Sequence, residues 1–187
     1  MNTTGIVILV VVVVLAAVAI FLYERKRSQR LRSRFGPEYN RAVEETGSRY
    51  RAEAKLEKLE KRVEGFSIHP LRAEDAARFR DSWRSVQAKF VDDPQTALRD
   101  ADRLLGELMS AQGYPLSDFE ERASEVSVNH PLVVEHYRAA HQIALRHDRG
   151  QATTEEMRQA MVHYRTLFDD LVGEPQAARA KAAGNTR

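Results

Sequence analysis

The stretch PQTALRDADRLLGELMSAQG, residues 94–113, decides the fold class of this chain. Its apolar side chains recur every three or four residues, which is the period of a helix with one buried face. Asp93 is a good N-cap for such a helix, Pro94 suits its first position, and Gly113 suits its end. The stretch therefore predicts an amphipathic helix whose inward side carries Leu98, Ala101, Leu104, Leu105, Leu108 and Gln112.

The same period extends to both sides of this stretch. We expect a helix over about 73–90, a short one after Ser117–Glu120 to about Val126, one from about Val133 to His147, and a last one to Val172. Ser117 with Glu120 and Thr153 with Glu156 match capping boxes. No stretch alternates with period two. The sequence predicts an all-α chain in which residues 66–172 form a bundle of about five helices.

The first part of the chain is apolar without interruption. Residues 5–23, GIVILVVVVVLAAVAIFLY, carry no charge, and a helix of this length spans ~28 Å, close to the ~30 Å hydrocarbon core of a bilayer. This predicts a transmembrane helix behind a short external stub, residues 1–4. A cleaved signal peptide is the alternative, but it would need basic residues ahead of the apolar run.

Basic residues follow this run and predict its orientation. Segment 24–36 is expected to contact the membrane surface through Arg25, Lys26, Arg27, Arg30, Arg32 and Arg34. The positive-inside rule then places the N-terminus outside and the C-terminal domain in the cytoplasm, at the inner (plasma) membrane. A specific acidic-lipid or nucleic-acid site is the alternative reading of this segment. The net charge is +2, but the remaining folded part is mildly acidic, which makes nucleic acid an unlikely partner.

Two further segments complete the expected organisation. Residues 37–65 are rich in charge and predict one polar spacer helix, with self-association, as in a coiled coil, as the alternative. Residues 173–187 are rich in alanine and predict a disordered tail.

A search for chemistry returns no catalytic, cofactor or metal signature. The chain has no cysteine, no glycine-rich phosphate loop and no His-Glu-x-x-His. The histidines are the best remaining candidates, because a site that joins His141 and His163 from two helices, completed by Glu135, is conceivable. A hydrogen-bonded histidine at the edge of the core is the simpler interpretation, so we expect no metal and no cofactor.

The runs WRSVQAKFVDDPQTALRDADRLLGELMSAQGYP and HYRAAHQIALRHDRGQATTEEMRQAMVHYRTLF resemble a group of bacterial single-pass membrane proteins with a helical cytoplasmic domain. The resemblance implies a bacterial inner-membrane protein. It implies no activity, substrate or catalytic residue, because no function is known for that group.

These observations favour a membrane-tethered interaction module, an adaptor or scaffold, over an enzyme. Its expected partners are the lipid bilayer, a protein of unknown identity and, as a further option, a second copy of the chain. An enzyme or metal-binding protein with a site near His141 and His163 is the alternative.

Overall fold

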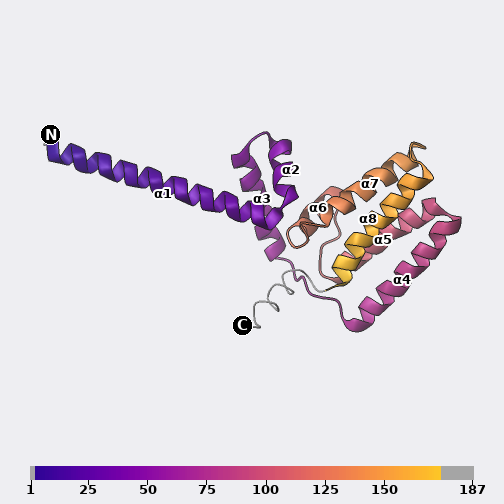
Figure 1. The fold of residues 1–187 in the computed structure, drawn as a ribbon. Coiled ribbons are helices and arrows are strands. Elements are labelled where there is room, and N and C mark those ends of the chain that lie inside the picture. The colour runs from indigo at the N-terminus through magenta and orange to yellow at the C-terminus, as the bar shows by residue number, and fades with distance from the viewer. Residues whose placement is uncertain (1–2, 174–187) are drawn as a thin grey trace, which may run out of the picture. The chain divides into compact units, whose positions relative to one another are not determined.

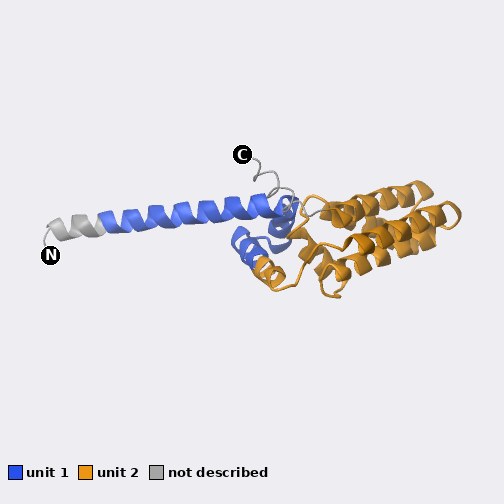
Figure 2. Ribbon diagram, turned by 90° about the horizontal axis from the view of Figure 1, so that it is seen from below, with its two compact units in different colours: residues 1–57 blue, residues 58–187 orange. Residues whose placement is uncertain are grey.

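The computed structural model describes residues 3–173, with side chains from Val11 onward. Within that part of the chain all regular structure is helical, as predicted. Contacts divide the chain into two compact units, residues 1–57 and 58–187 (Figure 2). Residues 1–2 of the expected external stub and residues 174–187 of the expected disordered tail lie outside the described residues.

Unit 1 consists of a long helix and two shorter segments that follow it. Helix α1 spans Thr3–Phe35, α2 spans Pro37–Thr46, and α3 spans Arg49–Glu64, with the boundary between the units inside α3. Gly36 and Gly47 separate these helices and have positive φ values of 49° and 62°. Residues 37–65 thus form two helices where the sequence predicted one, because Gly47 adopts the left-handed conformation that ends α2.

The described residues correct the prediction of membrane insertion. Among them, no helix is long and apolar enough to cross a membrane. The uncharged run with described side chains extends from Val11 to Tyr23, which corresponds to ~20 Å of helix, and Glu24, Arg25, Lys26 and Arg27 follow directly. This finding contradicts the predicted inner-membrane localisation with a cytoplasmic domain, and the transmembrane helix over 5–23 is not confirmed.

Unit 2 is a bundle of helices. It contains α4 (Ala73–Asp92), α5 (Pro94–Ala111), α6 (Phe119–Ser127), α7 (Val134–Asp148) and α8 (Thr154–Val172). Helix α5 packs against both α4 and α8, α8 packs against α7, and α7 contacts α6 (Figure 1). The four longer helices therefore lie in the spatial order α4, α5, α8, α7.

The core of unit 2 is built from the apolar faces that the sequence predicted. Trp83 of α4 stacks on Phe168 of α8 with ring centroids 4.8 Å apart. Tyr137 of α7 and Tyr164 of α8 are both fully buried, with centroids 6.2 Å apart. Helix α5 contributes seven side chains to this core: Ala97, Leu98, Ala101, Leu104, Leu105, Leu108 and Met109. The inward side of residues 94–113 is thereby confirmed.

Two of the three predicted helix starts have the expected caps. The Asp93 carboxylate accepts a hydrogen bond of 3.0 Å from the Thr96 backbone N–H. Thr153 and Glu156 form a complete capping box at the start of α8. At the start of α6, however, Asp118 is the cap instead of Ser117, and its carboxylate accepts from the Glu121 N–H at 2.9 Å. Aspartate is as good a cap as serine, so neighbouring candidates are not separated by residue type alone.

A close backbone contact follows the end of α5. Gly113 has φ 95°, and a Cβ added there would lie 2.3 Å from the Ser67 carbonyl oxygen. One residue earlier, the Gln112 carbonyl accepts a hydrogen bond of 2.9 Å from the His69 N–H. The segment before α4 is therefore held against the end of α5 at a position that requires glycine.

Candidate functional site

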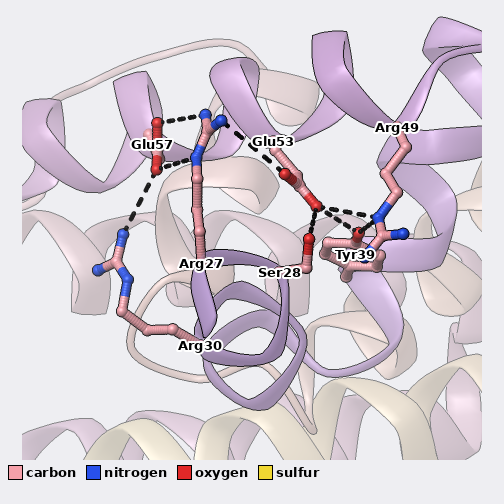
Figure 3. Close-up of polar contacts among 7 residues, drawn as sticks. All are labelled: Arg27, Ser28, Arg30, Tyr39, Arg49, Glu53 and Glu57. Atoms are coloured by element: carbon pink, nitrogen blue, oxygen red, sulfur yellow. Dashed lines mark hydrogen bonds and ion pairs between the residues drawn. The ribbon is translucent and has the colours of Figure 1, made fainter. Parts of the chain in front are cut away.

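The most connected polar cluster of unit 1 surrounds Glu53 of α3. Its side chain is 7% exposed. The carboxylate accepts hydrogen bonds from the Ser28 hydroxyl at 2.5 Å and the Tyr39 hydroxyl at 2.8 Å (Figure 3). One carboxylate thus joins the helices α1, α2 and α3.

Arg49 completes the set of donors around this carboxylate. Its Nε lies 3.2 Å from the Glu53 oxygen and 3.2 Å from the Tyr39 hydroxyl. Burial raises the pKa of Glu53, but the hydrogen bonds from Ser28, Tyr39 and Arg49 outweigh it, so that the pKa lies below its ordinary value. Glu53 is therefore a charged acceptor whose role is structural, not a proton donor.

Arg27 and Glu57 form a second ion pair, which joins α1 to α3. Arg27 donates from Nε and Nη2 to the two oxygens of Glu57, each at 2.7 Å, in the bidentate geometry that suits guanidinium and carboxylate (Figure 3). Arg30 lies 3.7 Å from the same carboxylate. The hydrogen bond to Glu57 raises the pKa of Arg27. Glu57 of α3 thus neutralises two basic residues of α1.

The six basic residues predicted to contact a membrane surface have different surroundings. Arg27 and Arg30 face Glu57, and the Arg32 guanidinium lies over the Tyr39 ring at 5.1 Å. Arg25, Lys26 and Arg34 are exposed. At least half of the segment therefore makes contacts within unit 1, and its predicted role at a membrane surface remains a prediction.

A hollow of about 510 Å³ adjoins the Glu53 cluster. Arg25, Arg27 and Arg49 contribute positive charge to its wall, Phe21 and Tyr50 contribute aromatic rings, and Glu24, Ser28 and Glu53 complete it. Arg27 is already hydrogen-bonded to Glu57, and Glu53 accepts hydrogen bonds from Ser28, Tyr39 and Arg49. The buried acid of the hollow, Glu53, and its hydroxyl, Ser28, are therefore engaged with each other, and its other acid, Glu24, is exposed.

The histidines do not come together as the sequence suggested. His141 is half-buried and stacks on Phe119, with ring centroids 3.5 Å apart. His163 instead faces His136 of α7, with 2.9 Å between the two Nδ1 atoms. Glu135 is exposed. In the described chain, no group of three or more histidine, aspartate or glutamate side chains is arranged to hold a metal ion.

Burial affects both half-buried histidines in the same direction. It lowers the pKa of His141 and of His163, and the charge of His136 lowers the pKa of His163 further. The sequence suggested His141 as the candidate partner of His163. It did not indicate the pair of His136 with His163, because the rotation of one helix against the other decides that contact.

A second polar cluster in unit 2 was not predicted. Arg122 of α6 donates to the Tyr137 hydroxyl at 3.2 Å and to the Ser117 carbonyl at 3.2 Å, and its guanidinium lies against Gly106 of α5. Burial, followed by the charge of Asp102, raises the pKa of Tyr137 and of Tyr164. The two phenols therefore remain protonated.

This cluster borders a groove of about 780 Å³. Its wall includes the polar residues Asp102, Arg122 and Ser117 and the apolar residues Phe79, Leu104 and Leu116. The hydrogen bonds of Arg122 hold the segment before α6 against α7. The Arg122 side chain therefore has a structural role.

Two hydrogen bonds hold the end of α8. The His130 Nδ1 atom lies 2.5 Å from a carboxylate oxygen of Asp170, and the Gln112 side chain donates to the Leu171 carbonyl at 2.8 Å. His130 lies between α6 and α7, directly before Pro131. Its partner lies 40 positions away and leaves no local signal.

Comparison with known proteins assigns neither a family nor a function to this chain. No protein family, curated protein or solved structure matches this chain. The resemblance to bacterial single-pass membrane proteins therefore stays a prediction.

Proposed function

We propose that the chain is a helical interaction module that acts by binding, and that copies of it associate through the apolar stretch of α1. The observation that carries this proposal is the exposure of that stretch. Between Val11 and Tyr23 the large apolar side chains are each 49–70% exposed. They are Val11, Val12, Val13, Val14, Leu15, Val18, Ile20, Phe21, Leu22 and Tyr23.

An exposed apolar surface of this extent calls for a partner. Contiguous apolar patches on monomers are typically limited to a few hundred Å², and larger ones mark interaction sites. Full burial of one large aliphatic or aromatic side chain is worth ~1.5–3 kcal/mol. Covering even part of this stretch would stabilise a complex substantially.

Two features favour a second copy as the partner. Residues 11–15 are consecutive, and at 3.6 residues per turn they point in all directions around the helix. Each neighbouring helix covers one side of the stretch, so an assembly of several copies covers more of it than the groove of a single partner does. In addition, Glu57 neutralises Arg27 and Arg30 just beyond the stretch, which reduces the repulsion between copies at that end.

Small side chains also fit this arrangement. Ala16, Ala17 and Ala19 lie in the middle of the stretch, and the distance between packed helices depends on the size of the side chains at the contact. The proposal therefore predicts the closest approach of two copies near these alanines.

The test uses the absence of cysteine from the sequence. Single cysteines are introduced one at a time at positions 11–23 of the full chain, and intact cells that produce it are treated with an oxidant. Association predicts disulfide-linked dimers whose yield rises and falls every three or four positions, as expected for helices in contact. Val91→Cys is the control, because Val91 is 82% exposed on α4 and outside the proposed surface.

Two results would overturn self-association. In the first, every α1 variant stays monomeric, or dimerises no more than Val91→Cys does. In the second, the products have masses other than that of a dimer, which would identify a different protein as the partner of α1.

A further inference from the structure

We infer that His136 and His163 form a binding site for a divalent transition-metal ion of the zinc, nickel or copper class. The site lies in unit 2, where α7 and α8 pack against each other. It is separate from the apolar stretch of α1, so it stands or falls independently of the proposed function.

The geometry places two imidazole nitrogens close to the separation that one metal ion requires. The two Nδ1 atoms are 2.9 Å apart, and the rings have centroids 5.0 Å apart with 27° between their planes. Two nitrogens bound to zinc at ~2.0–2.1 Å with a tetrahedral angle lie ~3.3 Å apart. Small side-chain rotations are enough to open the pair by the remaining few tenths of an ångström.

The backbone around the pair is fixed by its neighbours. Each histidine directly precedes a tyrosine that is fully buried, Tyr137 in α7 and Tyr164 in α8. Those two rings are 6.2 Å apart in the core, which sets the rotation of each helix. The repeated His-Tyr pairs therefore hold the two Nδ1 atoms toward each other before any ion arrives.

The ligand type and exposure select the class of ion. Imidazole nitrogen suits zinc, copper and nickel, whereas magnesium and calcium prefer oxygen. Both histidines are partly exposed, so water can complete the coordination. With two protein ligands, the site has open positions and is weaker than a closed structural zinc site.

Without metal, the pair is a hydrogen bond in which one Nδ1–H donates to the lone pair of the other ring. Metal binding would replace that shared proton and leave the same two atoms engaged. A purely structural pair has the same resting geometry, so the discriminating measurement must include the ion.

The experiment titrates the full chain, purified without a histidine tag, with Zn²⁺ in a calorimeter. We expect one equivalent of ion to bind per chain, and the affinity to fall about tenfold or more in His136→Ala and in His163→Ala. His141→Ala is the matched control, because His141 is also half-buried on α7 but stacks on Phe119, and its affinity is expected to remain unchanged.

A second measurement covers the case in which an alanine variant fails to fold. Co²⁺ replaces Zn²⁺, and its visible absorption reports nitrogen coordination directly in the unaltered chain and in His136→Gln, which keeps a polar side chain of similar reach. Loss of the nitrogen-ligated spectrum in His136→Gln supports the site. The inference is overturned if the unaltered chain shows no saturable binding, or if a chain with both histidines replaced binds the ion equally well.

Discussion

The carboxylate of Glu53 accepts a hydrogen bond of 2.5 Å from the hydroxyl of Ser28, and this bond links α3 to α1 across 25 positions of sequence. Tyr39 and Arg49 donate to the same oxygen. A buried carboxylate with three donors contributes to stability as long as it is charged.

Glu53→Gln is therefore expected to destabilise unit 1 by about 2 kcal/mol at neutral pH, because hydrogen bonds to a charged group are worth ~1.5–3 kcal/mol. Hydrogen exchange of the backbone amides of α2 and α3 measures the effect. The control is Glu45→Gln, since Glu45 also pairs with Arg41 and Lys55 but is 40% exposed, and it should cost less than about 1 kcal/mol.

The effect of Glu53 also has a defined pH dependence. Its pKa is lowered in the folded chain, so its contribution is present above the ordinary value of 4.5 and is lost as the pH falls through the lowered pKa. The difference in stability between the unaltered chain and Glu53→Gln should shrink on acidification. A difference that stays constant with pH would contradict the assigned charge state.

Glu125 in α6 should behave in the opposite way. It is fully buried, and burial raises its pKa even though Arg62 lies 3.1 Å away. A raised pKa means that the charged form is disfavoured in the folded chain, so stability is lost as the pH rises through it. Denaturation of Glu125→Gln and of the unaltered chain over a pH series measures this effect. From acid to neutral pH, the free energy of unfolding of the variant should rise relative to that of the unaltered chain. The prediction fails if the relative stability of the variant rises toward acid pH instead.

Phe168→Ala is expected to lower the free energy of unfolding of unit 2 by about 3–5 kcal/mol, because it removes a buried ring and leaves a cavity beside Trp83. Trp83 is the only tryptophan of the chain, so its fluorescence reports the unfolding of this unit alone. Val91→Ala, at an 82% exposed position of α4, should change stability by no more than about 0.5 kcal/mol.

Gly113→Ala and Gly47→Ala form a matched pair. Both glycines have positive φ, but a Cβ at Gly113 meets the Ser67 carbonyl at 2.3 Å, whereas a Cβ at Gly47 has nothing within 4 Å. Gly47→Ala should therefore cost about 1 kcal/mol from backbone strain alone, and Gly113→Ala about 3 kcal/mol or more. Thermal unfolding followed by circular dichroism measures both. Equal costs would exclude the close contact with Ser67.

The sequence was sufficient for the helices of unit 2 and their inward faces, because periodicity records which side of a helix is buried. It also identified the caps at Asp93 and Thr153, which act within one turn. It failed where the decisive contact is distant. Nothing local indicates that Arg27 pairs with Glu57, or that His163 faces His136 and not His141, since many residues of each type are available and the helix rotation chooses among them.

The N-terminal helix illustrates a different limit. Composition predicted a membrane span, then a basic segment, then a separate spacer. The structure has one continuous helix from Thr3 to Phe35, and its basic part is tied to α3 through Glu53 and Glu57. Apolar content describes the chemistry of a segment, but it does not show which other segment will neutralise the charges beside it.

The order α4, α5, α8, α7 in unit 2 has a consequence for how this unit folds. Helices α4 and α5 are adjacent in sequence and in space, as are α7 and α8, whereas the contact between α5 and α8 joins distant parts of the chain. Local pairs close faster than distant ones. Unit 2 is thus made of two helical hairpins that can form separately and then dock, and the connection between Gln112 and Asp118 is where the chain could be cut into two fragments that reassemble.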